Sequence, residues 1–454
     1  DTAGYTIVES GGSTSVTESG TTDTFTLVLN TQPLSDVVFS ISSSDTGEAT
    51  VTTTLTFTPA NWDTAQTGTV TGIDDSIIDG TQTATITVSI NDGSSDDDFD
   101  SLADQTITTS NVDDDVAGFT IAETDGSTAV AESGSTDTFT VVLNAQPTSD
   151  VVLSITSNDT GESSIPSAIT FTSANWDTAQ TVTVTGVDDD IIDGEQGSSL
   201  TITIDDSNSD NDFDSVADQT VSVTTSDNDV AGFTIAETDG STGVAESGST
   251  DTFTVVLDAQ PSSDVVIAIT SGDTGEATVS GSLTFTSANW DTAQTVTVTG
   301  VDDDIIDGTI TSTITASIVD AISDTNFGSV SDETVSVTTS DDDVAGITIA
   351  VTDGSTGVAE SGTTDTFTLV LDAQPSSDVV ITLTSSDNGE ITVTSTLTFT
   401  SANWDTAQTA TVTGVDDNLV DGSQGSTVTI SIDDSNSDND FDAVADQTVS
   451  VTTT

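Results

Sequence analysis

Clusters of acidic side chains are the part of this sequence most suited to chemistry. Carboxylate oxygens are hard ligands, and Ca²⁺ binds several of them in flexible geometry. Ionised carboxylates crowded at one place repel one another unless a cation lies between them. The clusters therefore predict a calcium site, with solvated acidic loops as the alternative. Within residues 116–229 they are Glu132 in VAESG, Asp159 in SNDTG, Asp188, Asp189 and Asp193 in GVDDDIIDG, and Asp227 and Asp229 in SDND.

The composition excludes most other chemistry. The 454 residues include 78 Asp and Glu but no Lys, Arg or His, so the formal net charge is −78. Without cysteine or histidine there is no thiolate, no imidazole base and no common transition-metal ligand. Without Lys or Arg nothing neutralises phosphate, so we expect no nucleic-acid binding. No apolar run is long enough for direct membrane insertion. The counter-charge must come from solution, as bound Ca²⁺ or as screening salt.

A repeat of 114 residues organises the chain. Tryptophan occurs at 62, 176, 290 and 404, and each step is 114. This period is the size of one autonomous domain rather than of a solenoid unit. The sequence therefore predicts four repeats at 1–115, 116–229, 230–343 and 344–454, of which the last lacks its closing acidic cluster. We expect the chain to be a segment of a longer protein with further repeats.

Alternation of apolar residues with Thr and Ser predicts that each repeat is all-β. Pro and Gly separate the alternating runs, as in NAQPTSD at 144–150. Seven short strands in about 110 residues are typical of an immunoglobulin-like β-sandwich. Four such sandwiches in tandem would form an elongated rod. In the second repeat the predicted strands are 117–123, 137–144, 150–156, 167–173, 179–187, 198–205 and 218–225.

The predicted sandwich brings the acidic clusters to the joints between repeats. Alternate loops of a seven-stranded sandwich lie at the same end, so the VDDD segment after the fifth strand can lie beside the SDND segment after the seventh. Glu132, in the loop after the first strand, is a candidate neighbour. The acids at each joint would then clamp one repeat to the next through calcium. We call them the seam acids: Asp113, Asp114 and Asp115; Asp227 and Asp229; and Asp341, Asp342 and Asp343.

The run DDDVAGITIAVTDGSTGVAESG at 341–362, taken with GVDDDIIDG, resembles the Calx-beta domain. That family includes calcium-sensing domains of sodium–calcium exchangers and many repeats of large bacterial surface proteins. The resemblance covers nearly the whole of each repeat. It implies a seven-stranded sandwich that binds several Ca²⁺ ions at its distal loops, next to the following domain.

The resemblance also implies the ligands. Two departures from the family pattern are Ser76, which breaks the Asp triplet in the first repeat, and Asn228, which replaces the middle seam acid. The implied ligands are Glu18, Asp45, Asp74, Asp75, Asp79, Asp113, Asp114 and Asp115; Glu132, Asp159, Asp188, Asp189, Asp193, Asp227 and Asp229; Glu246, Asp273, Asp302, Asp303, Asp307, Asp341, Asp342 and Asp343; and Glu360, Asp387, Asp416, Asp417 and Asp421.

Two further motifs have competing interpretations. The loop DDSNSDNDFD at 205–214 has the acidic spacing of a weak EF-hand match, without the Gly and Glu of that motif. It is either an additional ion site or a solvated loop in which Phe213 anchors packing. Trp176 in SANWD could stack on a sugar, but one Trp at a fixed position in every repeat favours packing.

These observations favour an extracellular structural repeat array over an enzyme. Paired carboxylates can cleave glycosides, but these acids recur in every repeat without an aromatic-lined cleft. We expect a calcium-stiffened rod at the cell surface, in a stalk, adhesin or filament. Its expected partners are neighbouring repeats and other copies in a filament or surface layer. The alternative is an adhesin whose repeats bind glycans or a partner cell directly, which an exposed aromatic patch would favour.

Overall fold

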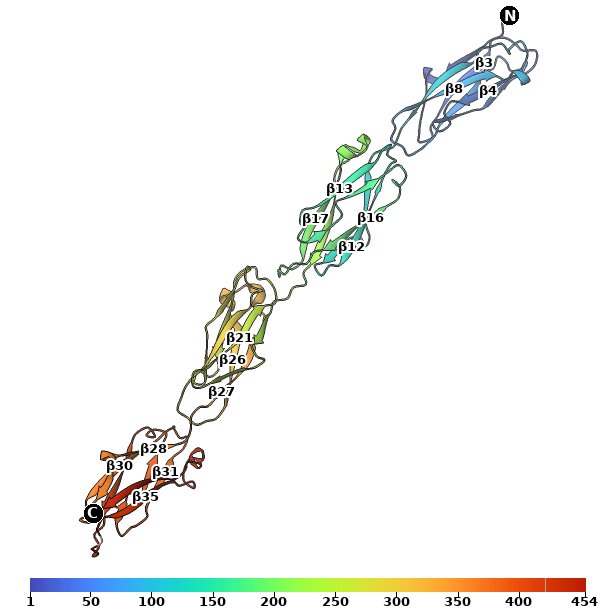
Figure 1. Ribbon diagram of the computed structural model, residues 1–454. Helices are drawn as coiled ribbons and strands as arrows, with labels where there is room; N and C mark the ends of the chain where they lie inside the picture. The colour runs from blue at the N-terminus through green and yellow to red at the C-terminus, as the bar shows by residue number, and fades with distance from the viewer. Residues whose placement is uncertain (421) are drawn as a thin grey trace. The chain divides into compact units, whose positions relative to one another are not determined.

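Each repeat folds into two β-sheets packed face to face (Figure 1). The computed structural model describes residues 1–420 and 422–454, and these contain strands and short 3-10 helices but no α-helix. The chain divides into two compact units. The first comprises Asp1–Asp189 and Asp193–Asn228, and the second comprises Asp190–Ile192 and Asp229–Thr454.

The first unit contains the strands of the first and second repeats. In the first repeat these are β1 (Tyr5–Glu9), β2 (Thr14–Thr17), β3 (Thr22–Leu29), β4 (Val37–Ser43), β5 (Ala49–Val51), β6 (Thr54–Phe57), β7 (Gln66–Gly72), β8 (Gln82–Ile90) and β9 (Gln105–Val112). In the second they are β10 (Phe119–Glu123), β11 (Thr128–Ala131), β12 (Thr136–Leu143), β13 (Val151–Ser157), β14 (Ser163–Ser164), β15 (Ala168–Phe171), β16 (Gln180–Gly186), β17 (Gln196–Ile204) and β18 (Gln219–Ser226).

The second unit contains the strands of the third and fourth repeats. In the third these are β19 (Phe233–Glu237), β20 (Thr242–Ala245), β21 (Thr250–Leu257), β22 (Val265–Ser271), β23 (Ala277–Val279), β24 (Leu283–Phe285), β25 (Gln294–Gly300), β26 (Ile310–Ile318) and β27 (Glu333–Ser340). In the fourth they are β28 (Ile347–Val351), β29 (Thr356–Val358), β30 (Thr364–Leu371), β31 (Val379–Ser385), β32 (Ile391–Val393), β33 (Thr396–Phe399), β34 (Gln408–Gly414), β35 (Gln424–Ile432) and β36 (Gln447–Thr453).

Short 3-10 helices occupy some of the loops. They are η1 (Ser10–Gly12), η2 (Asp92–Ser94), η3 (Asp206–Asn208), η4 (Asn211–Phe213), η5 (Asp320–Ile322), η6 (Thr325–Phe327), η7 (Thr352–Gly354) and η8 (Asn439–Phe441).

All four repeats share one sheet topology. In the second repeat a four-stranded sheet has the order β10-β12-β16-β14, and a five-stranded sheet has the order β11-β18-β17-β13-β15. Neighbouring strands are antiparallel except β11, which pairs parallel to β18. The all-β prediction and the prediction of tandem two-sheet sandwiches are thus confirmed.

The structure has nine strands per repeat where the sequence predicted seven. One addition is β11, which lies beyond the first predicted strand (117–123): a turn at Gly126 (φ 83°) separates it from β10, and it belongs to the other sheet. The other addition is β14, whose two residues pair with the end of β16. The seven predicted strands correspond to β10, β12, β13, β15, β16, β17 and β18.

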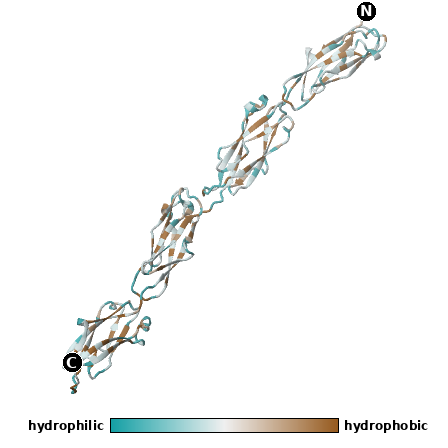
Figure 2. Cartoon of the chain, viewed as in Figure 1, coloured by the Kyte–Doolittle hydropathy of each residue, from teal (hydrophilic) through white to brown (hydrophobic). Residues whose placement is uncertain are grey.

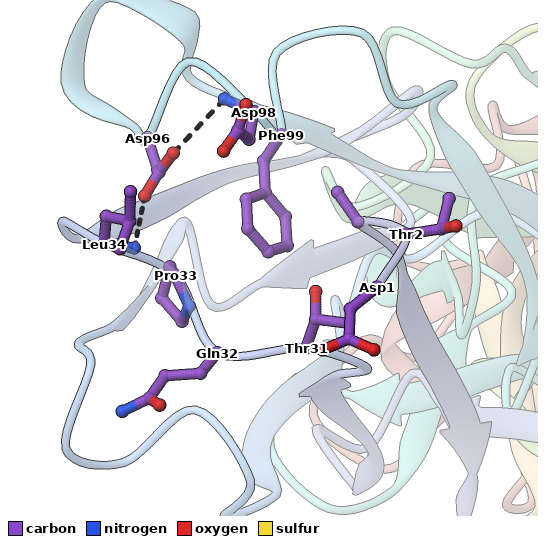
Figure 3. A pocket seen from close by; sticks show the side chains of 10 residues that line it. Asp1, Thr2, Thr31, Gln32, Pro33, Leu34, Asp96, Asp98 and Phe99 are labelled. Carbon is purple, nitrogen blue, oxygen red and sulfur yellow. Dashed lines mark hydrogen bonds between the residues drawn. The ribbon is translucent and has the colours of Figure 1, made fainter.

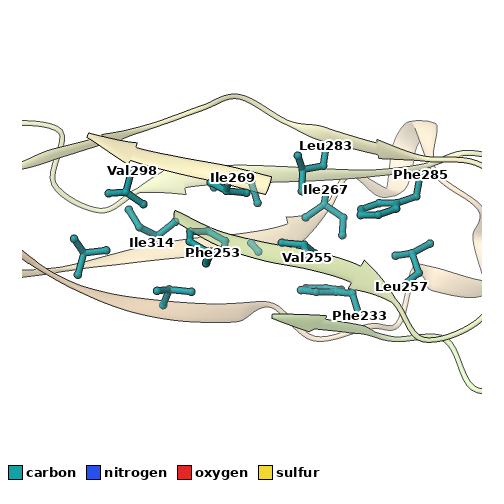
Figure 4. Close-up of a cluster of buried hydrophobic side chains, with 14 of the residues drawn as sticks. Phe233, Phe253, Val255, Leu257, Ile267, Ile269, Leu283, Phe285, Val298 and Ile314 are labelled. Carbon is teal, nitrogen blue, oxygen red and sulfur yellow. The ribbon is translucent and has the colours of Figure 1, made fainter. Parts of the chain in front are cut away.

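Alternating side chains build the core between the sheets. In β21 the residues Phe253, Val255 and Leu257 are buried while the Thr and Val side chains between them are not. Figure 4 shows these side chains stacked between the sheets against Ile267 and Phe285. Burying each such side chain contributes about 1.5–3 kcal/mol. Apolar residues accordingly mark the strands in Figure 2, and hydrophilic ones mark the loops.

Two packing predictions for aromatic residues are confirmed. Phe213 is fully buried in the core of the second repeat. Trp176 is partly buried and packs against the same core, and Trp290 does so in the third repeat. The described aromatic side chains therefore serve the fold.

Candidate metal centre

A buried glutamate follows the short second strand in each of the first three repeats. Glu18, Glu132 and Glu246 follow β2, β11 and β20 directly. The parallel pairing continues one residue further, because the N–H of Glu132 donates to the Ser226 carbonyl at 3.1 Å. This register places the glutamate beside the last residue of β18, where the seam acids begin.

A close backbone approach brings the acidic loop after β16 to the same place. Gly186 ends β16, and a Cβ at that position would collide with the carbonyl oxygen of Ala131. Glycine therefore lets β11 lie directly against β16. The loop GVDDDIIDG, which starts at Gly186, leaves the strand next to Glu132.

These glutamates are buried without the hydrogen bonds that a buried carboxylate needs. Each is 1% exposed. Both carboxylate oxygens of Glu18 and of Glu246 lack a hydrogen-bond partner, and so does Oε1 of Glu132. The other oxygen of Glu132 accepts a long bond of 3.4 Å from the N–H of Asn228. Such groups are costly to bury and call for a missing partner.

The surroundings raise the pKa of all three glutamates to about 7. Burial is the largest cause, and neighbouring aspartates add to it. For Glu132 those are Asp227 and Asp189, together with Glu162. The carboxylate is therefore held where its charged form is disfavoured unless a cation arrives.

Each glutamate meets two other acids at distances that one cation can bridge. In the first repeat the partners are Asp113 and Asp115, with one oxygen of each residue within 4.8 Å of the others. In the second repeat the group is Glu132, Glu162 and Asp189, and in the third it is Glu246, Asp303 and Asp343, within the same distance. The first set draws its hard oxygen donors from two segments of the chain, and each of the other two sets draws them from three.

The seam acids also fix the acidic loop in place. Asp113 accepts from the N–H of Gly80 through Oδ2 and from the N–H of Asp115 through Oδ1, both at 2.8 Å. Asp341 does the same for Gly308 at 2.9 Å and Asp343 at 2.7 Å. Gly80 has φ 70°, a conformation that favours glycine. One seam aspartate thus joins the end of β9 to the loop after β7.

Further aspartates in these clusters have raised pKa values. Burial raises the pKa of Asp115 and of Asp343. The nearby charge of Asp113 adds to the rise for Asp115, and that of Asp341 adds to it for Asp343. Burial likewise raises the pKa of Asp193 and Asp307 in the loops. Among the described residues no basic side chain offsets these charges, since the sequence contains none.

Burial alternates along the predicted ligand runs. The half-buried aspartates, which share the inward side, are Asp75, Asp113, Asp115, Asp189, Asp227, Asp229, Asp303, Asp341, Asp343 and Asp417. The exposed ones are Asp74, Asp79, Asp114, Asp188, Asp193, Asp302, Asp307, Asp342 and Asp416. Asp75 and Asp303 also accept from the N–H two residues ahead, both at 2.7 Å. The role of each as a ligand stays a prediction.

The sequence analysis missed Glu162, which lies three residues after the predicted ligand Asp159. Glu162 is 7% exposed, its Oε2 has no hydrogen-bond partner, and burial raises its pKa. Asp159 is exposed, and its Oδ1 accepts from the N–H of Gly161 at 3.0 Å. The signal was available, because the Glu of this motif recurs with the step of 114 residues at 48, 162, 276 and 390.

The same turn occurs in the other repeats. The aspartates that accept from the N–H two residues ahead in this way are Asp45, Asp159, Asp273 and Asp387. Their first oxygen is therefore committed to the backbone, and none of them belongs to the groups of three described above.

The fourth repeat differs from the others. Glu360 is only half-buried, and the described residues of this repeat form no group of three acids within bridging distance. Asp417 accepts from the N–H of Leu419 at 2.7 Å. The predicted ligand Asp421 lies outside the described residues.

A second buried acid lies at the other end of β18, in the loop with EF-hand-like spacing. Oδ2 of Asp210 accepts from the hydroxyl of Thr148 and the N–H of Ser149, both at 2.8 Å, and Oδ1 accepts from the N–H of Asp212 at 3.2 Å. Burial alone would raise its pKa, but these hydrogen bonds lower it. Asp324 and Asp438 have the same environment. Protein donors already satisfy this site.

Comparison with known proteins gives no family assignment. The sequence matches no protein-family model and no curated protein. Similar solved structures include domains 4–9 of the surface layer protein SbsC, with 15% identity over 98% of this chain and a TM-score of 0.22. The chain spans 65% of that fragment.

Two other similar structures come from different settings. CBD12 from CALX1.2 has 13% identity over 48% of this chain and 99% of its own, with a TM-score of 0.21. The human Desmocollin-1 ectodomain has 12% identity over 97% of this chain and 77% of its own, with a TM-score of 0.25. At these TM-scores the similarities carry no functional conclusion. Separately, no described segment forms a helix of the length and apolarity needed to cross a bilayer.

Proposed function

We propose that the chain is an extracellular structural repeat array of the Calx-beta type whose repeats bind Ca²⁺ at their acidic ends. One observation carries the proposal. In three repeats a glutamate buried to 1% exposure has at least one carboxylate oxygen without a partner and lies in a group of other acids, in a protein that has no basic side chain. A buried carboxylate without a partner is costly, and it stays ionised there only with a cation beside it.

The residues present fit calcium better than other metals. The donors are all carboxylate oxygens, which suit Ca²⁺, whereas zinc and copper prefer nitrogen or sulfur ligands that these groups lack. Glu18, Asp113 and Asp115 would hold the ion in the first repeat. Glu246, Asp303 and Asp343 would hold it in the third. In the second, Glu132, Glu162 and Asp189 would do so.

Bound calcium would stiffen each acidic end. It would neutralise carboxylates that otherwise repel one another. It would also tie the end of the short second strand to the segment after β9 in the first repeat, and to the loops after β16 and β25 in the second and third. Seam residues such as Asp113 also connect directly to the next repeat in sequence. We therefore propose a calcium-stiffened rod, suited to a stalk, adhesin or filament at the cell surface.

Direct binding of glycans has less support. The exposed large hydrophobic residues among those described are aliphatic, with no Trp, Tyr or Phe. Sugar-stacking surfaces need exposed aromatic faces, so the array interpretation is preferred. The acidic groups also recur in three repeats without an aromatic-lined cleft, which disfavours an enzyme.

Thermal unfolding by circular dichroism tests the proposal. At high NaCl, we expect Ca²⁺ to raise the melting temperature of the chain by well over 10 °C relative to chelator, since ions bound to the native state stabilise it by mass action. Mg²⁺ should reproduce little of this shift. Identical melts with Ca²⁺ and with chelator would overturn the proposal.

A triple variant controls for general charge effects. Glu18→Gln, Glu132→Gln and Glu246→Gln together should abolish most of the calcium-dependent rise. Replacing three exposed acids, such as Glu195, in the same way should leave the rise intact, because their loss changes the net charge equally without touching the groups of three.

A further inference from the structure

One buried strand residue at the acidic end differs between the first repeat and the others. Asn111, near the end of β9, lies at the position that Thr225 and Thr339 occupy in the second and third repeats. All three side chains are at most 1% exposed. Each contacts the glutamate that the sequence analysis missed, which is Glu48 in the first repeat and Glu162 in the second.

Asn111 gives its glutamate a hydrogen-bond donor from the protein. The Nδ2 atom of Asn111 donates to Oε2 of Glu48 at 3.2 Å and to the Ile73 carbonyl at 3.0 Å. Among the described residues, Glu48 belongs to no group of three acids within bridging distance. The group of the first repeat takes both of its aspartates from the seam acids instead.

The threonines leave one oxygen of the corresponding glutamate without a partner. The hydroxyl of Thr225 donates to the backbone carbonyl of Glu162 at 3.4 Å, and that of Thr339 donates to the Glu276 carbonyl at 3.5 Å. Oε2 of Glu162 and Oε2 of Glu276 have no hydrogen-bond partner, although each side chain is only 7% exposed. A buried carboxylate in this state needs a further donor or a cation.

The second repeat has two groups of acids within bridging distance, and Glu132 belongs to both. The inner position, as we call it, is the group of Glu132, Glu162 and Asp189 described above. The outer position joins Glu132 to Asp227 and Asp229, again with one oxygen of each within 4.8 Å of the others. Because a carboxylate has two oxygens, Glu132 can serve two cations at once.

The acids of the inner position are also present in the first repeat. They are Glu18, Glu48 and Asp75, each 114 residues before its counterpart. The described residues of this repeat nevertheless form only the outer position. The amide of Asn111, bonded to Glu48, is what separates the two repeats here.

Donors from the protein satisfy another buried acid of the first repeat. Asp96, the counterpart of Asp210, is 6% exposed and accepts from the backbone N–H groups of Leu34, Ser35 and Asp98. Figure 3 shows the bonds to Leu34 and Asp98. Such donors replace the water that a carboxylate loses on burial, and no ion is then needed.

We propose that the amide of Asn111 takes the place of a cation, so that the first repeat lacks the inner position and binds one Ca²⁺ fewer than the second. This inference rests on the proposed function, because it requires that calcium binds the acidic ends. A single residue of β9 thereby sets the number of ions, and the repeats are not equivalent in their dependence on calcium.

A buried water molecule is the alternative occupant of the inner position. It would donate a hydrogen bond to Oε2 of Glu162. It would not offset the repulsion between Glu162 and the neighbouring charge of Asp189, which helps to raise the pKa of Glu162. A cation does both.

Equilibrium dialysis of the whole 454-residue chain against saturating Ca²⁺, in high NaCl, counts the bound ions. Thr225→Asn should lower the count by one, and Asn111→Thr should raise it by one. The chain with both exchanges should bind as many ions as the unaltered chain. Each exchange introduces a residue that another repeat already carries at that position, which favours correct folding.

A matched pair of glutamate variants tests the same positions without altering β9 or β18. Glu162→Gln should lower the count by one, whereas Glu48→Gln should leave it unchanged, because Asn111 already bonds to Glu48. This pair decides the matter if an exchanged chain fails to fold.

Hydrogen exchange adds a readout that does not depend on counting ions. In chelator, Asn111→Thr should reduce protection of the first repeat, whose peptides around Pro59 are unique in the chain, and Ca²⁺ should restore it.

The outcomes separate this inference from the proposed function. If the unaltered chain binds calcium but neither exchange changes the count, water satisfies Glu162, and the role of Asn111 is overturned while calcium binding stands. If Glu48→Gln and Glu162→Gln change the count equally, the inference also fails. If the unaltered chain binds no calcium, the proposed function and this inference fail together.

Discussion

Two buried carboxylates at opposite ends of β18 show how environment decides the role of an acid. Asp210, before the strand, is 5% exposed and accepts three hydrogen bonds from protein donors. Glu132, beside the end of the strand, is 1% exposed and has one long hydrogen bond. The pKa of Asp210 is lowered, while that of Glu132 is raised to about 7.

The difference teaches that burial of a charge is not by itself a sign of a metal. Asp210 stabilises the fold, because two N–H groups and a hydroxyl replace the water molecules around its carboxylate. Glu132 has no comparable donors, and its neighbours are other acids. The metal proposal therefore attaches to the end with unpaired oxygens and not to the loop whose spacing suggested an EF-hand.

The largest change in stability should come from removing Asp210, the acid that accepts three hydrogen bonds. Asp210→Ala leaves buried donors unsatisfied, and we expect a loss of about 3 kcal/mol in the stability of the second repeat, with and without Ca²⁺. Hydrogen exchange followed by mass spectrometry can resolve this, because peptides around Ile165 are unique to that repeat. A loss that disappears in chelator would mean that Asp210 is a ligand.

The next largest change in stability should come from Glu132→Gln, and its sign should differ without and with Ca²⁺. Glu132→Gln removes a buried charge, so without Ca²⁺ at pH 8 we expect the second repeat to gain about 1 kcal/mol. With Ca²⁺ the same variant should lose most of the ion-induced protection. Glu195→Gln, an exposed charge change in the same repeat, is the control and should alter neither condition. If Glu132→Gln and Glu195→Gln changed the stability of the repeat equally in both conditions, Glu132 would not differ from an exposed acid.

The pH dependence should separate the two ends. A carboxyl whose pKa is raised from 4.5 to about 7 in the native state stabilises the calcium-free protein below pH 4.5, and this contribution is lost as pH rises to 7. The lowered pKa of Asp210 acts oppositely, contributing above its unfolded value and failing in acid. Chelated protein at high salt should thus melt higher at pH 5 than at pH 8.

Calcium should reverse that trend, because binding must displace the protons held by these glutamates. Calcium affinity measured by titration calorimetry should rise between pH 5 and pH 8. The triple Gln variant should flatten both profiles, and profiles that keep their slopes in this variant would assign the pH effect to other groups.

The smallest change in stability should come from Asp159→Asn, and it should distinguish Asp159 from Glu162. Asp159→Asn keeps an oxygen for the N–H of Gly161, so the stability of the repeat should change by less than about 0.5 kcal/mol. Its effect on calcium affinity should also be smaller than that of Glu162→Gln. The reverse order in calorimetry would restore Asp159 as the principal ligand of that loop.

Local patterns predicted most of the fold because burial alternates residue by residue along the longer strands. Seven of the nine strands of the second repeat were visible in this way. β11 was not, since TAVA is short and its parallel partner β18 lies about 95 residues further along the chain. β14 has only two residues and no alternation to detect.

The sequence predicted where in each repeat the candidate site lies, but it identified only some of the residues that form it. The repeat step located Glu132 and the seam acids, because their spacing survives in the one-dimensional sequence. It could not show that Asp159 turns its oxygen to the backbone while Glu162 points inward, since that depends on the loop conformation. In the sequence, the two isoleucines of the acidic loop were only part of an acidic motif. Their contact with the following repeat, such as the bridge from Ile77 to Gln146, is visible only in three dimensions.

The parallel pairing of β11 with β18 has a mechanical consequence. Tension on a repeat pulls its first residues backward along the direction of β11 and its last residues forward along β18. Because the two strands run the same way, such a load slides them past each other, and their hydrogen bonds must break together rather than one at a time. Resistance to pulling should therefore reside in this four-residue ladder, and it would set the force at which each repeat extends.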